Sequence, residues 1–212
     1  MDSGMKIKVC GMREAENMKA VESLGASMIG MIFWKGSSRY VSEKPKSLPT
    51  RSKRVGVFVD EDVERVVQTV GNYALDYVQL HGSESPSYIL TLRRQLEAAG
   101  FRLLIIKAFN IATAADLAAT VDYAGVADVF LFDTKGRQVG GNGEKFNWQV
   151  LSHYGGTTPF LLSGGIGPDD AGRVRAFSHP QCMGIDLNSR FETCPGMKNI
   201  AALSRFIDEL NK

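Results

Sequence analysis

Short apolar runs rich in Val, Ile and Phe recur along the chain, and their starts lie roughly 20 to 30 residues apart. That spacing fits a repeating unit of one strand, a turn, a helix and a second turn. The runs are nearly continuous in apolar character rather than alternating, which is typical of strands buried on both faces of a parallel sheet. The predicted strands are Lys6–Val9, Met28–Phe33, Val55–Val59, Tyr77–Leu80, Leu103–Ala108, Val129–Phe132, Pro159–Leu162 and Met183–Leu187.

Several of the intervening segments carry apolar residues at helical spacing. The pattern predicts helices over Ala15–Leu24, Asp62–Val70, Pro86–Ala99 and Met197–Leu210. Ser85 is the candidate N-cap of the third helix, with Pro86 in its first turn. The segment Lys44–Lys53 contains Pro45 and Pro49 and is a poor helix, so we expect a degraded or loop-like second crossover.

Eight strands with roughly seven helices in 212 residues predict an α/β fold, a single-domain (β/α)8 TIM barrel. The domain is expected to span residues 1–212, with a flexible N-terminus over residues 1–4. A doubly wound open sheet is the alternative. No Gly-x-Gly-x-x-Gly turn follows any early strand, which counts against the dinucleotide-binding version of that sheet.

Composition narrows the function classes. A net charge of +2 gives no electrostatic case for nucleic acid or a membrane surface as partner. The three cysteines are an odd number without a CxxC spacing or a metal-type His pairing, which fits a reduced cytoplasmic setting and no metal site. We see neither a signal-peptide pattern nor an apolar run of the roughly 20 residues that a membrane span needs.

Two chemically useful residues follow apolar runs that are far apart in sequence. Cys10 ends the first predicted strand and Asp133 ends the sixth. Active sites of barrels lie at the carboxyl ends of the strands, so a thiol and a carboxyl there can take and give a proton. One acid and one base are the fewest groups that a cofactor-free isomerase needs. The alternatives are that Cys10 is a small buried apolar residue and that Asp133 caps a helix or bonds a loop.

Other polar residues occupy the same end of the predicted barrel. Ser163-Gly164-Gly165 closes the seventh strand, where backbone N–H groups can approach a phosphate, although the two glycines also suit a tight turn. His81 is placed either to bond a loop or to contact substrate. Arg39 is either a solvated cation or a clamp for a carboxylate. The glycine-rich stretch Gly140-Gly141-Asn142-Gly143 predicts either a mobile lid or backbone N–H groups that donate to a ligand.

These pieces resemble the phosphoribosylanthranilate isomerases of tryptophan biosynthesis over nearly the whole chain. Each motif alone is weak, but their order is specific. The matching motifs are Lys8-Val9-Cys10-Gly11, Ser38-Arg39-Tyr40-Val41, Gly56-Val57-Phe58, Val78-Gln79-Leu80-His81-Gly82, Phe132-Asp133-Thr134, Gly140 to Trp148, Leu162 to Ile166 and Gly184 to Ser189.

The resemblance implies an Amadori rearrangement of N-(5-phosphoribosyl)anthranilate to 1-(2-carboxyphenylamino)-1-deoxyribulose 5-phosphate, without a cofactor. It implies that Asp133 is the general acid that opens the furanose ring and that Cys10 is the general base at the sugar C2′. The expected substrate-binding residues are Arg39, on the anthranilate carboxylate, together with His81, Gly141, Gly143, Ser163, Gly164, Gly165, Asp186, Asn188 and Ser189.

Two departures and three rival functions accompany this resemblance. The chain reads Gly141-Asn142-Gly143 and Phe146-Asn147-Trp148 where the family usually has a Gly-Thr-Gly-type loop and Phe-Asp-Trp. Arg190 replaces a family glycine, where it adds a phosphate-binding cation or points to solvent. The histidine-pathway isomerase uses two aspartates, against Cys10 here. Indole-3-glycerol-phosphate synthase uses a lysine and a glutamate, and only Lys107 is a candidate. A catalytically silent phosphate-binding barrel would need neither Cys10 nor Asp133. The expected partner is the phosphorylated sugar–anthranilate substrate, and the expected assembly is a monomer or a homodimer.

Overall fold

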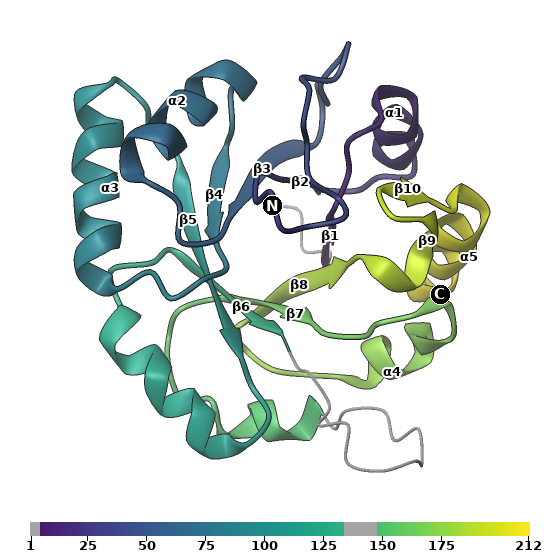
Figure 1. Cartoon of the computed structure of the whole chain (residues 1–212). Coiled ribbons are helices and arrows are strands. Elements are labelled where there is room, and N and C mark those ends of the chain that lie inside the picture. Colours follow the sequence, from purple (N-terminus) through teal and green to yellow (C-terminus); the bar gives the residue numbers. More distant parts are fainter. Residues whose placement is uncertain (1–4, 134–147) are drawn as a thin grey trace.

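The computed structural model describes residues 5–133 and 148–212, and within them eight parallel strands close into a barrel. Neighbouring strands follow chain order, and β8 pairs with β1 to close the ring. Figure 1 shows the helices around the outside of this ring. A closed ring excludes the doubly wound open sheet and confirms the (β/α)8 prediction.

Each predicted apolar run corresponds to one barrel strand, with bounds that differ by at most two residues. The strands are β1 (Lys6–Val9), β2 (Met28–Ile32), β3 (Lys53–Phe58), β4 (Tyr77–Leu80), β5 (Leu104–Asn110), β6 (Val129–Asp133), β7 (Phe160–Ser163) and β8 (Cys182–Leu187). The continuous apolar runs therefore correctly predicted strands that are buried on both faces.

The helical layer is less regular than the strands. The α-helices of the described residues are α1 (Ala15–Ser23), α2 (Val63–Tyr73), α3 (Pro86–Ala98), α4 (Ala171–Ala176) and α5 (Ile200–Leu210). Short 3-10 segments accompany them at η1 (Ala114–Tyr123), η2 (Trp148–His153), η3 (Pro168–Asp170) and η4 (Ser189–Phe191). The expectation of roughly seven good helices was too high, because 3-10 turns stand in the crossovers after β5 and β6 and residues 33–52, after β2, contain no helix.

The predicted start was correct for the third helix and too early for the last one. Ser85 accepts a hydrogen bond from the backbone N–H of Tyr88 at 3.2 Å, so it caps α3 as expected. The last helix begins at Ile200 rather than Met197, because the Asn199 side chain accepts from the N–H of Ala202 and starts the helix there. Met197–Lys198 instead form β10, paired with β9 (Glu192–Cys194) in a small hairpin.

Side chains alternate between the inside of the barrel and the layer under the helices, as the pleat of a strand requires. The inner set contains a compact apolar cluster: Met28, Val55, Tyr77, Ile106, Ala108, Val129, Leu131 and Leu161. The outer set, which includes Val9, Val78, Leu80 and Phe132, packs against the helices as the larger core. The polar residues at the carboxyl ends of the strands therefore pack against apolar side chains inside the barrel.

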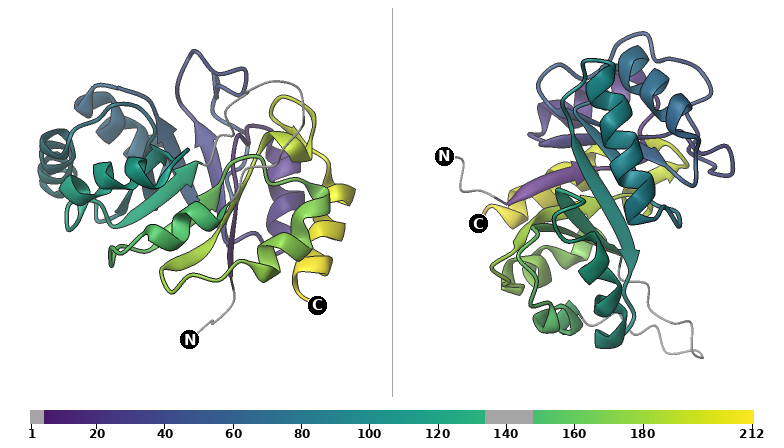
Figure 2. Two further views of the ribbon diagram at one scale, coloured as in Figure 1. Left: turned by 90° about the horizontal axis from the view of Figure 1, so that it is seen from below. Right: turned by 90° about the vertical axis from the view of Figure 1, so that its left-hand side faces the viewer.

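In both views of Figure 2, the start of β1 and the end of α5 lie on the same side of the barrel. This is the amino-terminal end of the strands, because the outer helices run antiparallel to the strands they cover. The opposite end carries the loops after the strands. No helix in the described part of the chain is long and apolar enough to span a membrane.

Candidate active site

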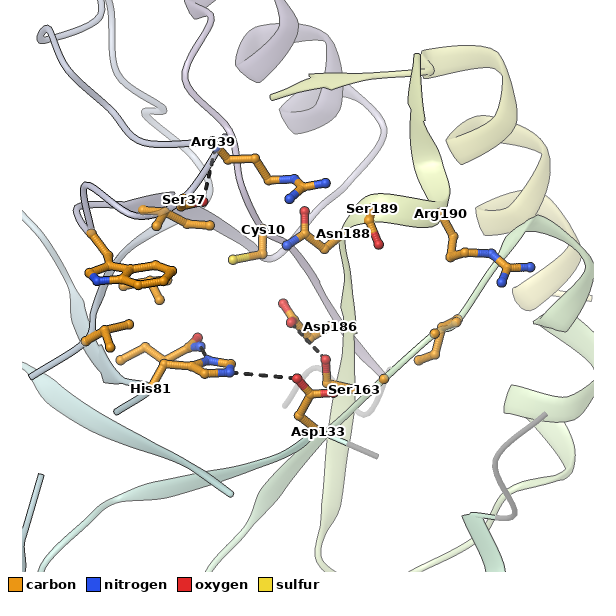
Figure 3. Close-up of a pocket in the computed structure, with 18 residues that line it drawn as sticks. Cys10, Ser37, Arg39, His81, Asp133, Ser163, Asp186, Asn188, Ser189 and Arg190 are labelled. Atoms are coloured by element: carbon orange, nitrogen blue, oxygen red, sulfur yellow. Dashed lines mark hydrogen bonds and ion pairs between the residues drawn. The ribbon is translucent and has the colours of Figure 1, made fainter. Parts of the chain in front are cut away.

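A cavity of about 650 Å³ opens at the carboxyl ends of the barrel strands, a size typical of small-molecule sites. It brings together residues from nearly every part of the sequence (Figure 3). Its lining consists of Cys10, Ile32, Trp34, Ser37, Arg39, Val57, Val59, Gln79, His81, Asp133, Ser163, Gly164, Gly165, Ile166, Asp186, Asn188, Ser189 and Arg190.

The strand alternation selects most of these residues. On β4, Tyr77 belongs to the inner apolar cluster, so Gln79 and then His81 point the same way, higher in the barrel. On β6 the same rule carries Val129 and Leu131 up to Asp133. The cavity is therefore the top layer of the barrel interior, with polar side chains above apolar ones.

Cys10 lies in this layer and is 4% exposed. Gly30 on the neighbouring strand makes room for it, since a Cβ at Gly30 would lie 2.8 Å from the Cys10 sulfur. The next residue, Gly11, has φ +76° and a hypothetical Cβ there would overlap both Arg39 and Asn188. Two glycines thus allow the thiol, Arg39 and Asn188 to meet at the cavity.

Charged groups surround the thiol. Lys8, two residues earlier on β1, is fully buried, and its Nζ lies 2.6 Å from Asp186 Oδ1. Burial raises the pKa of the Cys10 thiol, against the attraction of Lys8 and Lys198, while Asp186 raises it further. Burial lowers the pKa of Lys8, but Asp186 and Cys10 outweigh it and leave the pKa above its ordinary value.

Asp133 faces the cavity from the β6 side, opposite Cys10 (Figure 3). Its Oδ2 lies 3.7 Å from His81 Nε2. The other ring nitrogen of His81 is 2.9 Å from Gln79 Nε2. Gln79 is 1% exposed, and its Oε1 has no hydrogen-bond partner among the described residues. A buried acceptor on the cavity wall is thereby left open to a hydroxyl donor.

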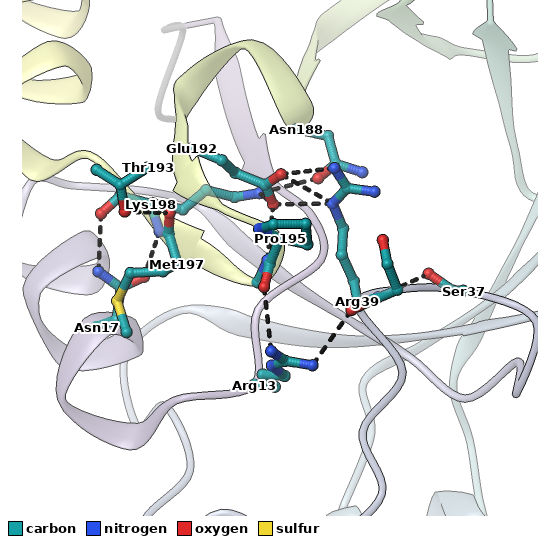
Figure 4. A network of polar contacts seen from close by, with 12 residues as sticks. Arg13, Asn17, Ser37, Arg39, Asn188, Glu192, Thr193, Pro195, Met197 and Lys198 are labelled. Carbon is teal, nitrogen blue, oxygen red and sulfur yellow. Dashed lines mark hydrogen bonds and ion pairs between the residues drawn. The ribbon is translucent and has the colours of Figure 1, made fainter.

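Arg39 reaches the cavity rim from the loop after β2, but it is not a free cation (Figure 4). Its Nε and Nη2 donate to the carboxylate of Glu192 at 2.6 to 3.0 Å. Lys198 Nζ donates to the same carboxylate at 2.6 Å and to Asn188 Oδ1 at 2.8 Å. Burial opposes ionisation of Glu192, yet the hydrogen bonds from Arg39 and Lys198 lower its pKa to about 2.

The loops after β7 and β8 form a polar end of the cavity. Gly164 and Gly165 have φ of +98° and +66°, a left-handed conformation that favours glycine and turns the backbone at the end of β7. Ser163 Oγ donates to Asp186 Oδ2 at 3.1 Å. Arg190 lines the same end.

The structure brings together every candidate site residue that it describes, and two candidates, Gly141 and Gly143, are outside the described residues. The other ten candidates all line the same cavity: Cys10, Asp133, Arg39, His81, Ser163, Gly164, Gly165, Asp186, Asn188 and Ser189. Sequence reasoning did not single out Trp34, Gln79, Lys8 or Glu192. Gln79 was detectable from the sequence, since it precedes His81 by two residues on the same strand face.

No group of three or more His, Cys, Asp or Glu suited to a metal ion occurs in residues 5–133 and 148–212. The polar cavity offers instead a thiol, a carboxyl and an imidazole beside a glycine-turned loop. Together, the fold and the site define the class: a (β/α)8-barrel enzyme equipped for proton transfer on a small polar ligand.

The comparisons with known proteins agree with that class. A family profile described as N-(5'phosphoribosyl)anthranilate (PRA) isomerase matches residues 7–209. N-(5'-phosphoribosyl)anthranilate isomerase of Phocaeicola vulgatus is 48% identical over 208 residues, covering 98% of each chain. The structure of phosphoribosyl anthranilate isomerase from Thermotoga maritima matches with a TM-score of 0.79 and 28% identity, covering 98% of this chain and 99% of that one.

A further solved structure holds a relevant ligand. It is a phosphoribosyl anthranilate isomerase in complex with reduced 1-(o-carboxyphenylamino)-1-deoxyribulose 5-phosphate, with a TM-score of 0.77 and 25% identity, and 98% and 99% of the two chains are covered. The chain belongs to the N-(5'-phosphoribosyl)anthranilate isomerase family. It is an isomerase that converts N-(5-phosphoribosyl)anthranilate to 1-(2-carboxyphenylamino)-1-deoxyribulose 5-phosphate by an Amadori rearrangement in tryptophan biosynthesis.

Proposed function

We propose that Asp133 is the general acid and Cys10 the general base of this isomerisation. The observation that carries the proposal is that the two side chains face each other across one cavity from strands β6 and β1 (Figure 3). Acid and base on opposite sides of a bound sugar can act on different atoms without exchanging protons directly.

The first step would belong to Asp133. Its protonated carboxyl gives a proton to the furanose ring oxygen, the C1′–O bond breaks with its electron pair going to that oxygen, and a protonated Schiff base forms at C1′. His81 lies 3.7 Å from the Asp133 carboxylate and would support the anion that this transfer leaves behind.

The second step would belong to Cys10. The thiolate removes the proton from C2′, the C–H electron pair forms the C1′–C2′ double bond, and the imine nitrogen becomes neutral in the enolamine. The enolamine then gains a proton at C1′ and loses its C2′ hydroxyl proton to give the ketose. Burial raises the pKa of Cys10, so the positive charge of the Schiff base would help to form the thiolate when it is needed.

The distribution of cavity residues supports one orientation of the substrate. Ile32, Trp34 and Val57 give an apolar wall on the β2–β3 side, suited to the aromatic ring of anthranilate. Gly164 and Gly165, in the loop after β7, would supply backbone N–H donors to the phosphate. Ser163, Asp186, Asn188, Ser189 and Arg190 complete this polar end, and the departure at Arg190 would add a cation there.

Arg39 would bind the anthranilate carboxylate at the rim. Glu192 occupies its Nε and Nη2, so the substrate carboxylate would meet the remaining face of the guanidinium or compete with Glu192 for it. The ion pair holds Arg39 in one orientation before substrate arrives, which reduces the entropy lost on binding. His81, with Gln79 behind it, would contact the sugar near Asp133. Gly141 and Gly143 stay predictions of the sequence.

The test uses freshly prepared phosphoribosylanthranilate and follows the loss of its fluorescence. Cys10→Ser is expected to lower kcat by orders of magnitude, because a hydroxyl is a far weaker base than a thiolate. Asp133→Asn is expected to abolish ring opening while the affinity for the reduced product analogue stays within about tenfold of the parent. Near-normal kcat in either variant removes that residue from the mechanism, and Asp186 would be the next candidate acid.

Further expectations from the sequence stay part of this proposal. We expect no organic cofactor and no nucleic acid or membrane partner, a cytoplasmic location, and a chain that is a monomer or a homodimer. Analytical ultracentrifugation of the purified chain separates the two assemblies. Activity that survives exhaustive dialysis against a chelator would support cofactor-free chemistry, and activity lost on dialysis and restored by a metal ion would contradict it.

A further inference from the structure

Lys8 is a buried lysine that the mechanism above does not use. It is 0% exposed and belongs to the inner face of the barrel, where its register partner on β2, Met28, is part of the inner apolar cluster. Taking an ammonium group out of water costs several kcal/mol unless partners compensate it. Packing alone would favour an apolar residue here, so the charge calls for a separate explanation.

The position of Lys8 places its charge beside Cys10. Residues two apart on a strand point to the same face, and Lys8 precedes Cys10 by two on β1. The Lys8 ammonium lies 2.6 Å from Asp186 Oδ1 on the adjacent strand, where Lys8 and Asp186 are register partners. Ser163 Oγ donates to the other oxygen of Asp186, so the carboxylate that binds the ammonium group is itself held in place.

We propose that Lys8 is a positioning residue for Cys10: its buried ammonium group stabilises the thiolate that would take the substrate proton, and Asp186 holds that ammonium group in place. This inference rests on the proposed role of Cys10 as the base. It adds the residue that makes an otherwise buried and neutral thiol able to ionise.

The other charges around Cys10 come from three further elements. Lys198 on β10 and Arg39 after β2 are also cations that attract the thiolate, but Glu192 binds both of them. Asp186 on β8 opposes the thiolate. Lys8 is the charge that lowers the pKa of Cys10 most, ahead of Lys198. Lys8 is therefore the residue whose removal should affect the thiolate most.

The experiment measures the alkylation rate of Cys10 by iodoacetamide at neutral pH, with peptide mass spectrometry to resolve each cysteine. Lys8→Met is expected to slow alkylation of Cys10 roughly ten- to thousandfold, since an opposite charge nearby changes a pKa by about one to three units. The value of kcat at neutral pH should fall in parallel and recover as the pH is raised. The exposed Cys194 is an internal control whose rate should not change.

Two further variants guard against a purely structural effect. Lys107→Met removes another buried lysine, which pairs with Glu84 at 3.0 Å, and it should leave the alkylation of Cys10 unchanged. Lys8→Met/Asp186→Asn removes both charges of the pair and avoids a lone buried carboxylate. Because Lys8 affects Cys10 more than Asp186 does, the double variant should still be alkylated more slowly than the parent, but faster than Lys8→Met.

The outcomes separate this proposal from the one on which it rests. An unchanged alkylation rate of Cys10 in folded Lys8→Met, or an equal slowing in Lys107→Met, overturns the role of Lys8 even if Cys10→Ser is inactive. Slowed alkylation in Lys8→Met without any change in the pH profile of kcat overturns the link to catalysis. If Cys10→Ser is also fully active, it is the role of Cys10 itself that has failed.

Discussion

Two of the buried lysine–carboxylate pairs among the described residues, Lys8–Asp186 and Lys107–Glu84, have different surroundings. Lys8 and Asp186 lie inside the barrel, where Asp186 lines the cavity, at an Nζ–O distance of 2.6 Å. Lys107 and Glu84 lie in the layer between strands and helices, at 3.0 Å, with the rings of Phe109 and Tyr123 near the ammonium. Both lysines are almost fully buried, so burial and pairing alone do not reveal which pair serves the reaction.

The two pairs differ in how many of the lysine's hydrogen-bond donors are used. Lys107 donates to the carbonyls of Leu80 and Gly82 as well as to Glu84, which uses all three of its donors. Glu84 also accepts from the backbone N–H groups of Asp60 and Gly82. This pair fixes the loops after β3 and β4 and leaves nothing for a ligand.

The inner pair keeps capacity for chemistry. In the described structure, Lys8 donates to one carboxylate, and the next charge-sensitive group beside it is the Cys10 thiol. Asp186 lines the cavity and accepts from Ser163. The comparison teaches that a buried ion pair with all its hydrogen bonds satisfied supports the fold, whereas one beside an ionisable cavity residue can control that residue's proton.

The largest expected effect is on stability. Lys107→Met leaves Glu84 buried without its cation, so we expect the free energy of unfolding to fall by about 3–5 kcal/mol. The kcat of the folded protein should stay within about threefold of the parent. Urea unfolding and steady-state kinetics measure the two quantities. A kcat loss of orders of magnitude with intact stability would reverse the comparison and give Lys107 the catalytic role that a synthase-like barrel requires.

A third set of ion pairs, at the rim, predicts an acid-dependent loss of stability. The pKa of Glu192 falls from 4.5 to about 2 on folding, so Glu192 stabilises the fold at pH above 4.5. That contribution of about 3 kcal/mol is lost as the pH falls from 4.5 to about 2. Unfolding free energies of the parent and of Glu192→Gln should therefore converge on acidification. Parallel pH curves for the two proteins would contradict the shift.

Arg39 should affect substrate use more than stability. Arg39→Ala is expected to raise KM and to lower kcat/KM by a factor of roughly 10 to 100, which corresponds to about 1.5–3 kcal/mol for a charge-assisted pair. Inorganic phosphate should inhibit this variant as well as it inhibits the parent, because the phosphate site proposed above is at Gly164 and Gly165 rather than at Arg39. An equal loss of phosphate inhibition would assign Arg39 to the phosphate site, and unchanged kinetics would make it a rim residue without a role.

The smallest effect concerns Gln79. Gln79→Leu removes the contact with His81 and also removes the unpaired Oε1, so stability should change by less than about 1 kcal/mol. The value of kcat/KM should fall by roughly fivefold, the size of one neutral hydrogen bond. The matched variant Gln79→Glu keeps the acceptor oxygen and should retain more activity than Gln79→Leu. Equal loss in both variants would deny that the oxygen receives a substrate hydroxyl.

The sequence predicted the strands better than the helices for a physical reason. A strand buried on both faces must be apolar throughout, and that run is visible without any knowledge of its neighbours. The helical layer depends on tertiary contacts: the crossover after β5 is the 3-10 segment Ala114–Tyr123, and Met197 belongs to β10 rather than to α5. Nothing in the local pattern at Met197 indicated the pairing with Cys194.

The site was predictable where a residue's place on its strand decides its role. Cys10 directly follows β1, Asp133 ends β6, and both line the cavity, as expected. The candidate Lys107 could have been excluded from the alternation, because it is out of phase with Ile106 and Ala108 of the inner cluster. The pairing of Arg39 with Glu192 could not have been foreseen, since it joins the loop after β2 to strand β9, 153 residues away in sequence.

The central claim is that Asp133 opens the ring and Cys10 then removes the C2′ proton. It is tested most directly with substrate that carries deuterium at C2′, compared with ordinary substrate in the parent and in both variants. Cys10→Ser makes proton removal slowest, so its kcat should show the largest primary isotope effect. Asp133→Asn makes ring opening slowest, so its residual kcat should show almost none. The reverse order, with the larger effect in Asp133→Asn, would contradict the assignment of the two roles.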